Sequence, residues 1–204
     1  MNDIENDERL EKLFDEIREA VSYFKSDERN TSIRENVIFR AIADKLLTDF
    51  ERAEYYGLPD TCRMREGVKI ISPENLICGD YVYISENAII DASGGLEIGN
   101  HTTIGVNACI WTHSTVYSTL SLSQFSPAPY NSRKRSIIGN GVFIGANSVI
   151  MPGTSIADLT VIQPLSLVDF IISETNSIVG GNPARIVGHI SNEKIKSKTQ
   201  EGFK

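Results

Sequence analysis

The chain lacks any long apolar run and any excess of basic residues, and both absences narrow its function. Its 204 residues carry a formal net charge of −7, so nucleic acid is not an expected partner, because binding it depends on a basic surface. No apolar run approaches the roughly 20 residues that span a bilayer, so no membrane span is expected. The acidic first residues lack the apolar stretch of a secretion signal. We therefore expect a cytoplasmic protein.

Cysteine is also scarce. The three cysteines, Cys62, Cys78 and Cys109, have no Cys-x-x-Cys spacing. An odd, sparse set of this kind fits a reducing compartment and not a disulfide framework. Cys109 lies in an apolar, repetitive stretch, so we expect it to fill the protein interior and not to act as a nucleophile.

The N-terminal part of the chain shows helical periodicity. Apolar residues recur at steps of three and four over residues 8–25 and again over residues 33–56, which predicts two amphipathic helices. Ser32 followed by Glu35 is a capping-box pattern for the second helix, and Gly57-Leu58-Pro59 ends it. We expect both helices to pack against the main domain or a sister subunit.

A six-residue repeat replaces the helical pattern from about residue 68. An aliphatic residue returns at every sixth position, a small residue often follows it, and a small or β-branched residue stands four positions after it. The in-phase aliphatic positions are Ile84, Ile90, Ile98, Ile104, Ile110, Ile138, Ile144, Ile150, Ile156, Ile162 and Val168. The small or β-branched positions are Ala88, Thr102, Ala108, Val142, Ser148, Thr154 and Thr160. A period of six differs from the period of two that strands of a β-sandwich require.

This repeat predicts a solenoid in which three short strands close one triangular coil of about 18 residues. Each strand turns one aliphatic side chain inward, and stacked coils build an interior column of isoleucine and valine. Glycine, asparagine and aspartate near the corners tolerate the dihedral angles of turns. Two segments interrupt the repeat. Gly94-Gly95 shifts its phase, and residues 114–136 leave it as a long loop that ends in Arg133-Lys134-Arg135.

At these repeats the chain resembles the hexapeptide-repeat acyltransferases, and within them the sugar O-acetyltransferases of the maltose and galactoside kind. The resemblance covers about residues 68–190. It rests on the repeat, on the loop that begins just after Trp111-Thr112-His113-Ser114, and on the terminal segment Gly180-Gly181-Asn182-Pro183-Ala184-Arg185-Ile186-Val187. It implies a mainly β fold, a left-handed parallel β-helix with an N-terminal α-helical segment and one extruded loop. It also implies a homotrimer with active sites between subunits.

These patterns divide the chain into three parts. Residues 1–66 form the N-terminal helical segment. Its residues 1–56 are longer and more acidic than the helical segment with which the maltose and galactoside enzymes begin. Residues 67–190 form the left-handed β-helix acetyltransferase domain, with residues 114–136 as its extruded loop. Residues 191–204 form a basic C-terminal tail.

The resemblance implies transfer of an acetyl group from acetyl-CoA to a hydroxyl of a sugar or polysaccharide-related acceptor. A hydroxyl is a poor nucleophile at neutral pH until a base removes its proton. His113 ends a strand and opens the long loop, where the family places its base, whereas His101 falls in mid-coil and His189 lies beyond the coils. We expect direct transfer, in which His113 takes the hydroxyl proton and returns it to the leaving thiolate, without an acyl-enzyme or a metal.

The coenzyme residues follow from the same resemblance. Ala146, after Gly145, matches the position whose backbone N–H meets the thioester carbonyl, where it would stabilise the oxyanion. The coenzyme arm would lie along the coils after the loop, past Gly145, Ala146 and Pro164. Arg185 matches the basic position near the C-terminus that would bind the 3′-phosphate.

Acceptor recognition has two candidates, Asn87 and Asp91, which resemble the family stretch that holds the sugar. Asparagine and aspartate at corners also form turns. The basic run Arg133-Lys134-Arg135 could bind a phosphate or an anionic sugar, or it could be a solvated edge of the loop.

Other functions fit parts of the pattern. An N-acetyltransferase of a nucleotide-linked amino sugar and a xenobiotic acetyltransferase of the streptogramin type remain alternatives, and the second shares the layout of a histidine followed by a loop. A carbonic anhydrase with this fold would need three zinc histidines, two of them close in sequence, and the chain lacks that spacing. An inactive β-helix scaffold is the non-enzyme alternative, against which His113 and the retained loop argue.

Overall fold

The structure is a computed structural model, and it describes residues 45–123 and 132–191, together with Lys12, Asp15, Glu19 and Glu193. The chain divides into two compact units, Met1–Leu47 and Thr48–Lys204. Most of the two predicted helices and of the C-terminal tail lies outside the described residues. Among the described residues, no helix has the length and apolar character needed to cross a membrane.

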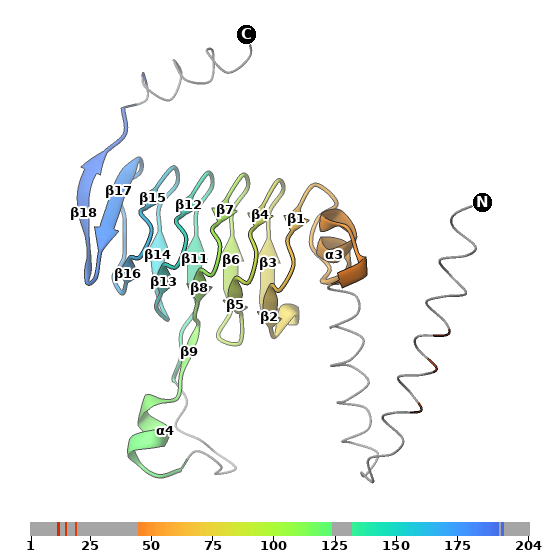
Figure 1. Ribbon diagram of the computed structural model, residues 1–204. Coiled ribbons are helices and arrows are strands. Elements are labelled where there is room, and N and C mark those ends of the chain that lie inside the picture. Colours follow the sequence, from red (N-terminus) through yellow and green to blue (C-terminus); the bar gives the residue numbers. More distant parts are fainter. Residues whose placement is uncertain are drawn as a thin grey trace. The chain divides into compact units, whose positions relative to one another are not determined.

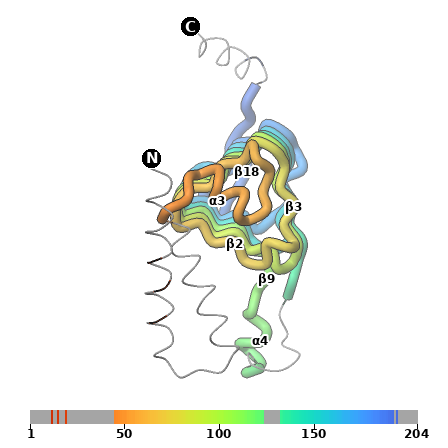
Figure 2. The backbone as a smooth tube through the Cα atoms, turned by 90° about the vertical axis from the view of Figure 1, so that its right-hand side faces the viewer, coloured from red at the N-terminus to blue at the C-terminus, as the bar shows by residue number. Residues whose placement is uncertain are grey.

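Three faces of short parallel strands build the second unit, which Figure 1 shows as a stack of coils. The first face is β1 (Arg63–Met64), β4 (Tyr83–Ile84), β7 (Thr103–Ile104), β12 (Phe143–Ile144), β15 (Val161–Ile162) and β17 (Ser177–Gly181), with β18 (Ala184–His189) antiparallel at its end. The second face is β2 (Lys69–Ile71), β5 (Ile89–Asp91), β8 (Cys109–Ile110), β13 (Val149–Ile150) and β16 (Leu167–Val168). The third face is β3 (Leu76–Cys78), β6 (Leu96–Ile98), β11 (Ser136–Ile138) and β14 (Ser155–Ile156). Figure 2 shows the coils superposed when they are viewed along the stack, so the predicted mainly β solenoid is confirmed.

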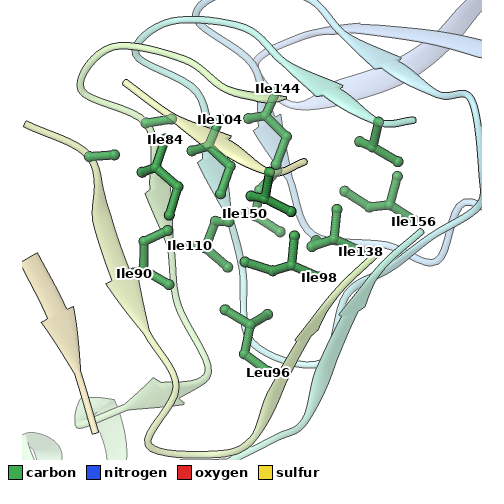
Figure 3. Packing of buried hydrophobic residues seen from close by; sticks show 14 of the residues in the cluster. Ile84, Ile90, Leu96, Ile98, Ile104, Ile110, Ile138, Ile144, Ile150 and Ile156 are labelled. Atoms are coloured by element: carbon green, nitrogen blue, oxygen red, sulfur yellow. The ribbon is translucent and has the colours of Figure 1, made fainter. Parts of the chain in front are cut away.

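The interior column is filled mainly by the in-phase aliphatic side chains, as the repeat predicts. All eleven in-phase isoleucine and valine residues are at most 2% exposed, and Figure 3 shows Ile84, Ile104 and Ile144 lying in sequence along the column. The small and β-branched residues four positions later are buried as well. The prediction for Cys109 is wrong, because this residue is only half buried and precedes the inward Ile110 on β8. Side chains alternate across a strand, so Cys109 faces outward.

Small residues follow the inward isoleucines because neighbouring coils touch there. A Cβ atom on Gly105 would lie 2.6 Å from the carbonyl oxygen of Ile144 and 2.7 Å from the backbone nitrogen of Ala146. No side chain fits at that corner without moving the next coil.

The coils differ in length at one corner. Ile144 is in register with Ile162, eighteen residues later, whereas Ile84 is in register with Ile104, twenty residues later. The two additional residues lie between the second and third faces, where the Gly94-Gly95 turn lies between β5 and β6. In the preceding coil the 3₁₀-helix η1 (Pro73–Asn75) fills the same corner. The phase break read from the sequence is therefore an enlarged corner.

The long loop leaves the solenoid at that same corner. It begins as a two-stranded antiparallel ribbon of β9 (His113–Ser114) and β10 (Ser132–Arg133) and carries helix α4 (Val116–Leu120). Figure 1 shows the ribbon and α4 projecting away from the stack. A loop extruded after His113 is confirmed for the part that the structure describes, but it ends before Ser136, which already belongs to β11 of the third face.

Helix α3 (Asp49–Tyr55) precedes the first coil. Thr48 and Glu51 form a capping box that starts this helix anew, so the prediction of one continuous helix over residues 33–56 is wrong at this point. The predicted end is confirmed, since α3 stops at Tyr55 and Gly57 adopts a positive φ of 73°. Strand β1 already belongs to the first coil, so the solenoid begins a few residues before residue 67.

Interior isoleucines should dominate the stability of the stack. We expect Ile144→Ala to lower the free energy of unfolding by about 2–5 kcal/mol, because it removes a fully buried side chain and leaves a cavity. Ile77→Ala is the matched control, since Ile77 lies on a strand of the same stack but is 64% exposed. Urea unfolding followed by circular dichroism measures both. Equal losses for the two variants would contradict the interior column.

Candidate functional site

His113 lies where the chain leaves the coil for the loop, and the buried carboxylate of Asp91 faces it. Nδ1 of His113 is 2.7 Å from Oδ2 of Asp91. The backbone N–H groups of Thr112 and His113 donate to the same oxygen at 2.8 and 3.0 Å. Asp91 is fully buried. One carboxylate therefore fixes both the ring and the backbone of His113.

Ser93 and Thr112 complete this arrangement. The hydroxyl of Ser93 is 3.0 Å from Nδ1 of His113, and its backbone N–H donates to Oδ1 of Asp91 at 3.1 Å. The hydroxyl of Thr112 donates to the carbonyl of Asp91 at 2.8 Å and accepts from the N–H of Gly94 at 2.8 Å. A Cβ atom on Gly94 would lie 2.9 Å from a backbone nitrogen at the base of the ribbon. The enlarged corner thus needs glycine where it meets the loop.

The charge on Asp91 decides the state of the histidine ring. Burial would raise the pKa of Asp91, but hydrogen bonds from Ser93, Thr112 and His113 lower that pKa to about 2. Asp91 is therefore ionised at neutral pH and can only accept hydrogen bonds. The short contact then requires the hydrogen on Nδ1 of His113, which leaves the Nε2 lone pair free to take a proton. The side chain of His113 is 28% exposed, so a small molecule has access to it.

The other two histidines lie elsewhere. His101 is exposed at a corner with a φ of 56°, and its ring stacks on Tyr81 at a centroid distance of 4.8 Å. His101 therefore faces solvent, away from the Asp91–His113 pair. His189 is exposed on β18, beyond the coils, and its Nε2 lies 2.9 Å from a carboxylate oxygen of Glu174.

The two predicted acceptor residues lie at opposite ends of one strand. Asp91 closes β5, and its oxygens accept hydrogen bonds from within the chain. Asn87 is exposed at the corner before β5, where it adopts a positive φ of 58°. Asn107 and Asn147 adopt the same conformation at the corresponding corners of the next two coils. The structure therefore brings Asp91 together with His113 and leaves Asn87 at another corner.

The predicted coenzyme residues Gly145, Ala146 and Pro164 lie together along one corner, between the first and second faces. The N–H of Leu165 donates to the carbonyl of Ala146 at 3.0 Å, which joins the two coils there. The N–H of Ala146 has no acceptor among the described residues, and the same holds for Val106 one coil earlier. Arg185 is exposed on β18 beyond this corner, opposite Gly180.

These two groups of residues lie a full face apart. His113 stands at the corner after the second face, whereas Ala146 stands at the corner before it. Within one chain the proton acceptor and the predicted N–H donor therefore do not meet. Among the described residues, no group of three or more histidine, cysteine, aspartate or glutamate side chains is placed to hold a metal ion.

Sequence reasoning missed Ser93 and Thr112 and did not pair Asp91 with His113. The signal was the coil length. Ile90 and Ile110 are in register, so the residue after Ile90 lies beside the segment that follows Ile110. If every coil is assumed to have 18 residues, Asp91 is not aligned with the residues next to His113. The enlarged corner makes this coil two residues longer, and that brings them together.

Comparison with known proteins agrees with the fold. Residues 135–169 match the family described as bacterial transferase hexapeptide (six repeats). WcaF of Escherichia coli strain K12, a protein named for acetyl transfer in colanic acid biosynthesis, is 26% identical over 128 residues, which are 61% of this chain and 64% of WcaF. The chain spans less than two thirds of the length of the curated relatives that it matches.

Two solved structures share the architecture. The acetyl-CoA complex of the hexapeptide-repeat acetyltransferase VCA0836 from Vibrio cholerae has a TM-score of 0.60 at 21% identity, covering 82% of this chain and 92% of that one. A maltose O-acetyltransferase from Clostridium difficile 630 has a TM-score of 0.58 at 20% identity, covering 89% and 86%. At this identity the likeness establishes the fold.

The depressed pKa of Asp91 predicts a specific acid sensitivity. The folded pKa of about 2 lies below the ordinary value of 3.8, so ionised Asp91 stabilises the fold above about pH 4, and this contribution is lost as the pH falls toward 2. We expect the gap in unfolding free energy between wild type and Asp91→Asn to shrink across that window. Denaturant unfolding at several pH values measures it, with Asp169→Asn as the control for an exposed carboxylate. A gap independent of pH would contradict the assignment.

Proposed function

We propose that this chain, in which residues 135–169 match the bacterial transferase hexapeptide family, transfers the acetyl group of acetyl-CoA to a hydroxyl of a sugar or polysaccharide-related acceptor. One observation carries the proposal. The ionised, buried carboxylate of Asp91 lies with its Oδ2 atom 2.7 Å from Nδ1 of His113, whose side chain is partly exposed. The names of the similar proteins, which refer to maltose O-acetylation and colanic acid biosynthesis, support the class of acceptor.

In the proposed mechanism, Nε2 of His113 accepts the proton of the acceptor hydroxyl while the oxygen attacks the thioester carbonyl. Asp91 stabilises the imidazolium that forms and keeps the ring oriented, as a buried carboxylate does in other histidine-based sites. The tetrahedral intermediate then collapses, the carbon–sulfur bond breaks, and His113 returns the proton to the thiolate. The acetyl group moves directly to the acceptor, so no acyl-enzyme forms.

We assign Asp91 to His113 and not to the acceptor. Both of its carboxylate oxygens accept hydrogen bonds from the chain, and the side chain is fully buried. Asn87 is exposed at the corner that also holds Ala146, so it remains a candidate for contact with an acceptor hydroxyl only from a second copy of the chain.

The oxyanion donor is the backbone N–H of Ala146, supplied by a second copy of the chain. Because His113 and Ala146 lie at different corners of the coil, one site is completed only where the His113 corner of one copy meets the Ala146 corner of another. This arrangement supports the homotrimer that the family resemblance implies. The coenzyme arm would follow the Gly145–Pro164 corner, and Arg185 would bind the 3′-phosphate.

A fully built base favours a hydroxyl acceptor over an amine. A free amine is already a good nucleophile and needs less help from a base, whereas a hydroxyl needs its proton removed during attack. The Asp91–His113 pair therefore favours O-transfer over N-transfer to a nucleotide-linked amino sugar, and an acceptor panel separates the two.

Removing the base should abolish transfer. We expect His113→Ala and Asp91→Asn each to lower kcat by about 10² or more, the second because an asparagine amide favours the wrong ring tautomer. Thiol release from acetyl-CoA is measured with a panel of neutral sugars, oligosaccharides, amino sugars and nucleotide sugars. His101→Ala, which removes an exposed histidine from another corner, is the matched control. Full activity in His113→Ala would refute the mechanism, and a response to amino sugars alone would favour N-transfer.

Removing the Ala146 N–H should also impair catalysis. Pro164 occupies the corresponding position of the next coil, and the following residue has a positive φ at both corners, so Ala146→Pro fits the same turn. We expect kcat to fall by about 10²–10³, the effect of losing one oxyanion donor. Val106→Pro removes the corresponding N–H one coil earlier and should leave kcat unchanged.

The shared site gives this variant a second test. Ala146→Pro and His113→Ala, mixed through unfolding and reassembly, should regain activity, because mixed assemblies contain sites with both groups intact. Absence of recovery in mixed assemblies would show that each chain holds a complete site.

A further inference from the structure

Arg133 lies directly opposite His113 at the base of the extruded ribbon. The register of β9 and β10 pairs these two residues. The N–H of Lys134 donates to the carbonyl of Thr112 at 2.8 Å, so the hydrogen bonds of the ribbon flank the His113–Arg133 pair. This is the non-hydrogen-bonded type of antiparallel pair, in which the Cα atoms approach most closely, to about 4.5 Å. Side chains of directly opposed residues share one face of the ribbon.

The other two members of the basic run already have partners. The guanidinium of Arg135 forms an ion pair with Glu97, and its aliphatic carbons pass over Gly95. The side-chain carbons of Lys134 lie over Gly153, within 3.1–3.8 Å of the position a Cβ atom would take there. Both side chains therefore cover turns of the solenoid.

Arg133 has no such role. It is exposed, and neither a hydrogen bond nor an ion pair joins its side chain to any of the residues that the structure describes. A guanidinium presents planar, paired donors that match a carboxylate or a phosphate. The same face holds a histidine backed by an ionised carboxylate, which would repel an approaching anion unless a cation compensated it.

We propose that Arg133 binds an anionic group of the acceptor, a carboxylate or a phosphate, close to the hydroxyl that His113 deprotonates. This inference rests on the proposed function and narrows its acceptor to an acidic or phosphorylated sugar. The coenzyme is not the source of the anion, because its pantetheine arm separates its phosphates from the thioester that reacts beside His113. The Arg185 end of the solenoid is the place proposed for those phosphates.

The experiment compares Arg133→Gln with Lys134→Gln, which removes the same charge from the neighbouring residue on the other face of the ribbon. The acceptors are methyl glucoside, methyl glucuronide and glucose 6-phosphate. We expect Arg133→Gln to raise KM for the preferred anionic acceptor by about 10–100-fold, as expected for losing a hydrogen-bonded ion pair. The kcat value and the KM values for methyl glucoside and acetyl-CoA should stay within about twofold. Lys134→Gln should change none of them, and Arg133→Lys should restore part of the affinity.

Saturation-transfer NMR of the same sugars gives a readout that does not need turnover. Wild type should bind methyl glucuronide or glucose 6-phosphate in preference to methyl glucoside, and Arg133→Gln should lose that preference. The carboxylate and phosphate arms identify the anion. If wild type shows this preference but transfers no acetyl group, the proposed function fails and the anion site stands.

Three results would overturn the inference itself. The first is a wild type that binds no anionic sugar better than the neutral one. The second is a rise in KM for acetyl-CoA in Arg133→Gln, which would assign the arginine to the coenzyme. The third is an equal loss in Arg133→Gln and Lys134→Gln, which would reduce the effect to the general charge of the loop.

Discussion

The register between neighbouring coils is the constraint on which the rest of this structure depends. Within each face a short strand is hydrogen-bonded to the strand of the neighbouring coil, and a buried isoleucine or valine on most strands keeps the coils in phase. A slip by one residue would turn the whole interior column outward. The number of residues in each coil therefore decides which side chains meet at a corner. Asp91 meets His113 because Ile90 is locked beside Ile110.

The sequence predicts most of the solenoid because the period of six has one physical explanation. The inward residues, the buried small residues and the loop that follows His113 were all identified this way, whereas the pairing with Asp91 was not. That pairing depends on two additional residues at one corner. A phase break in the repeat shows that one coil is longer than 18 residues, but it does not show which side chains meet at the larger corner.

Two predictions were wrong for local reasons. Cys109 was expected in the interior but occupies an outward position on its strand, and the helix expected over residues 33–56 is interrupted by a capping box at Thr48.

The enlarged corner links fold and chemistry. Its length lets Ser93 and the Gly94 turn lie against Thr112 and Asp91, so that hydrogen bonds within the chain hold the carboxylate ionised although it is buried. Burying a charge is costly unless it is compensated, and here four N–H donors compensate it. The 18-residue coils that follow lack the two additional residues. The candidate site therefore lies at an enlarged corner of the repeat, and the 18-residue coils begin only after the loop.

The loop and the solenoid can change independently in evolution, because the loop joins the stack only through the two-stranded ribbon. Ile104 and Ile144 are in register although forty residues separate them in the sequence. The loop therefore does not disturb the pairing of the coils before and after it. Lengthening a loop costs little additional entropy once its ends are fixed. Selection could therefore exchange the loop freely, and with it the residue opposite His113, the proposed base, while the solenoid and His113 stay as they are. In such proteins, specificity for a new acceptor would arise by replacing this loop, with little change in the free energy of unfolding.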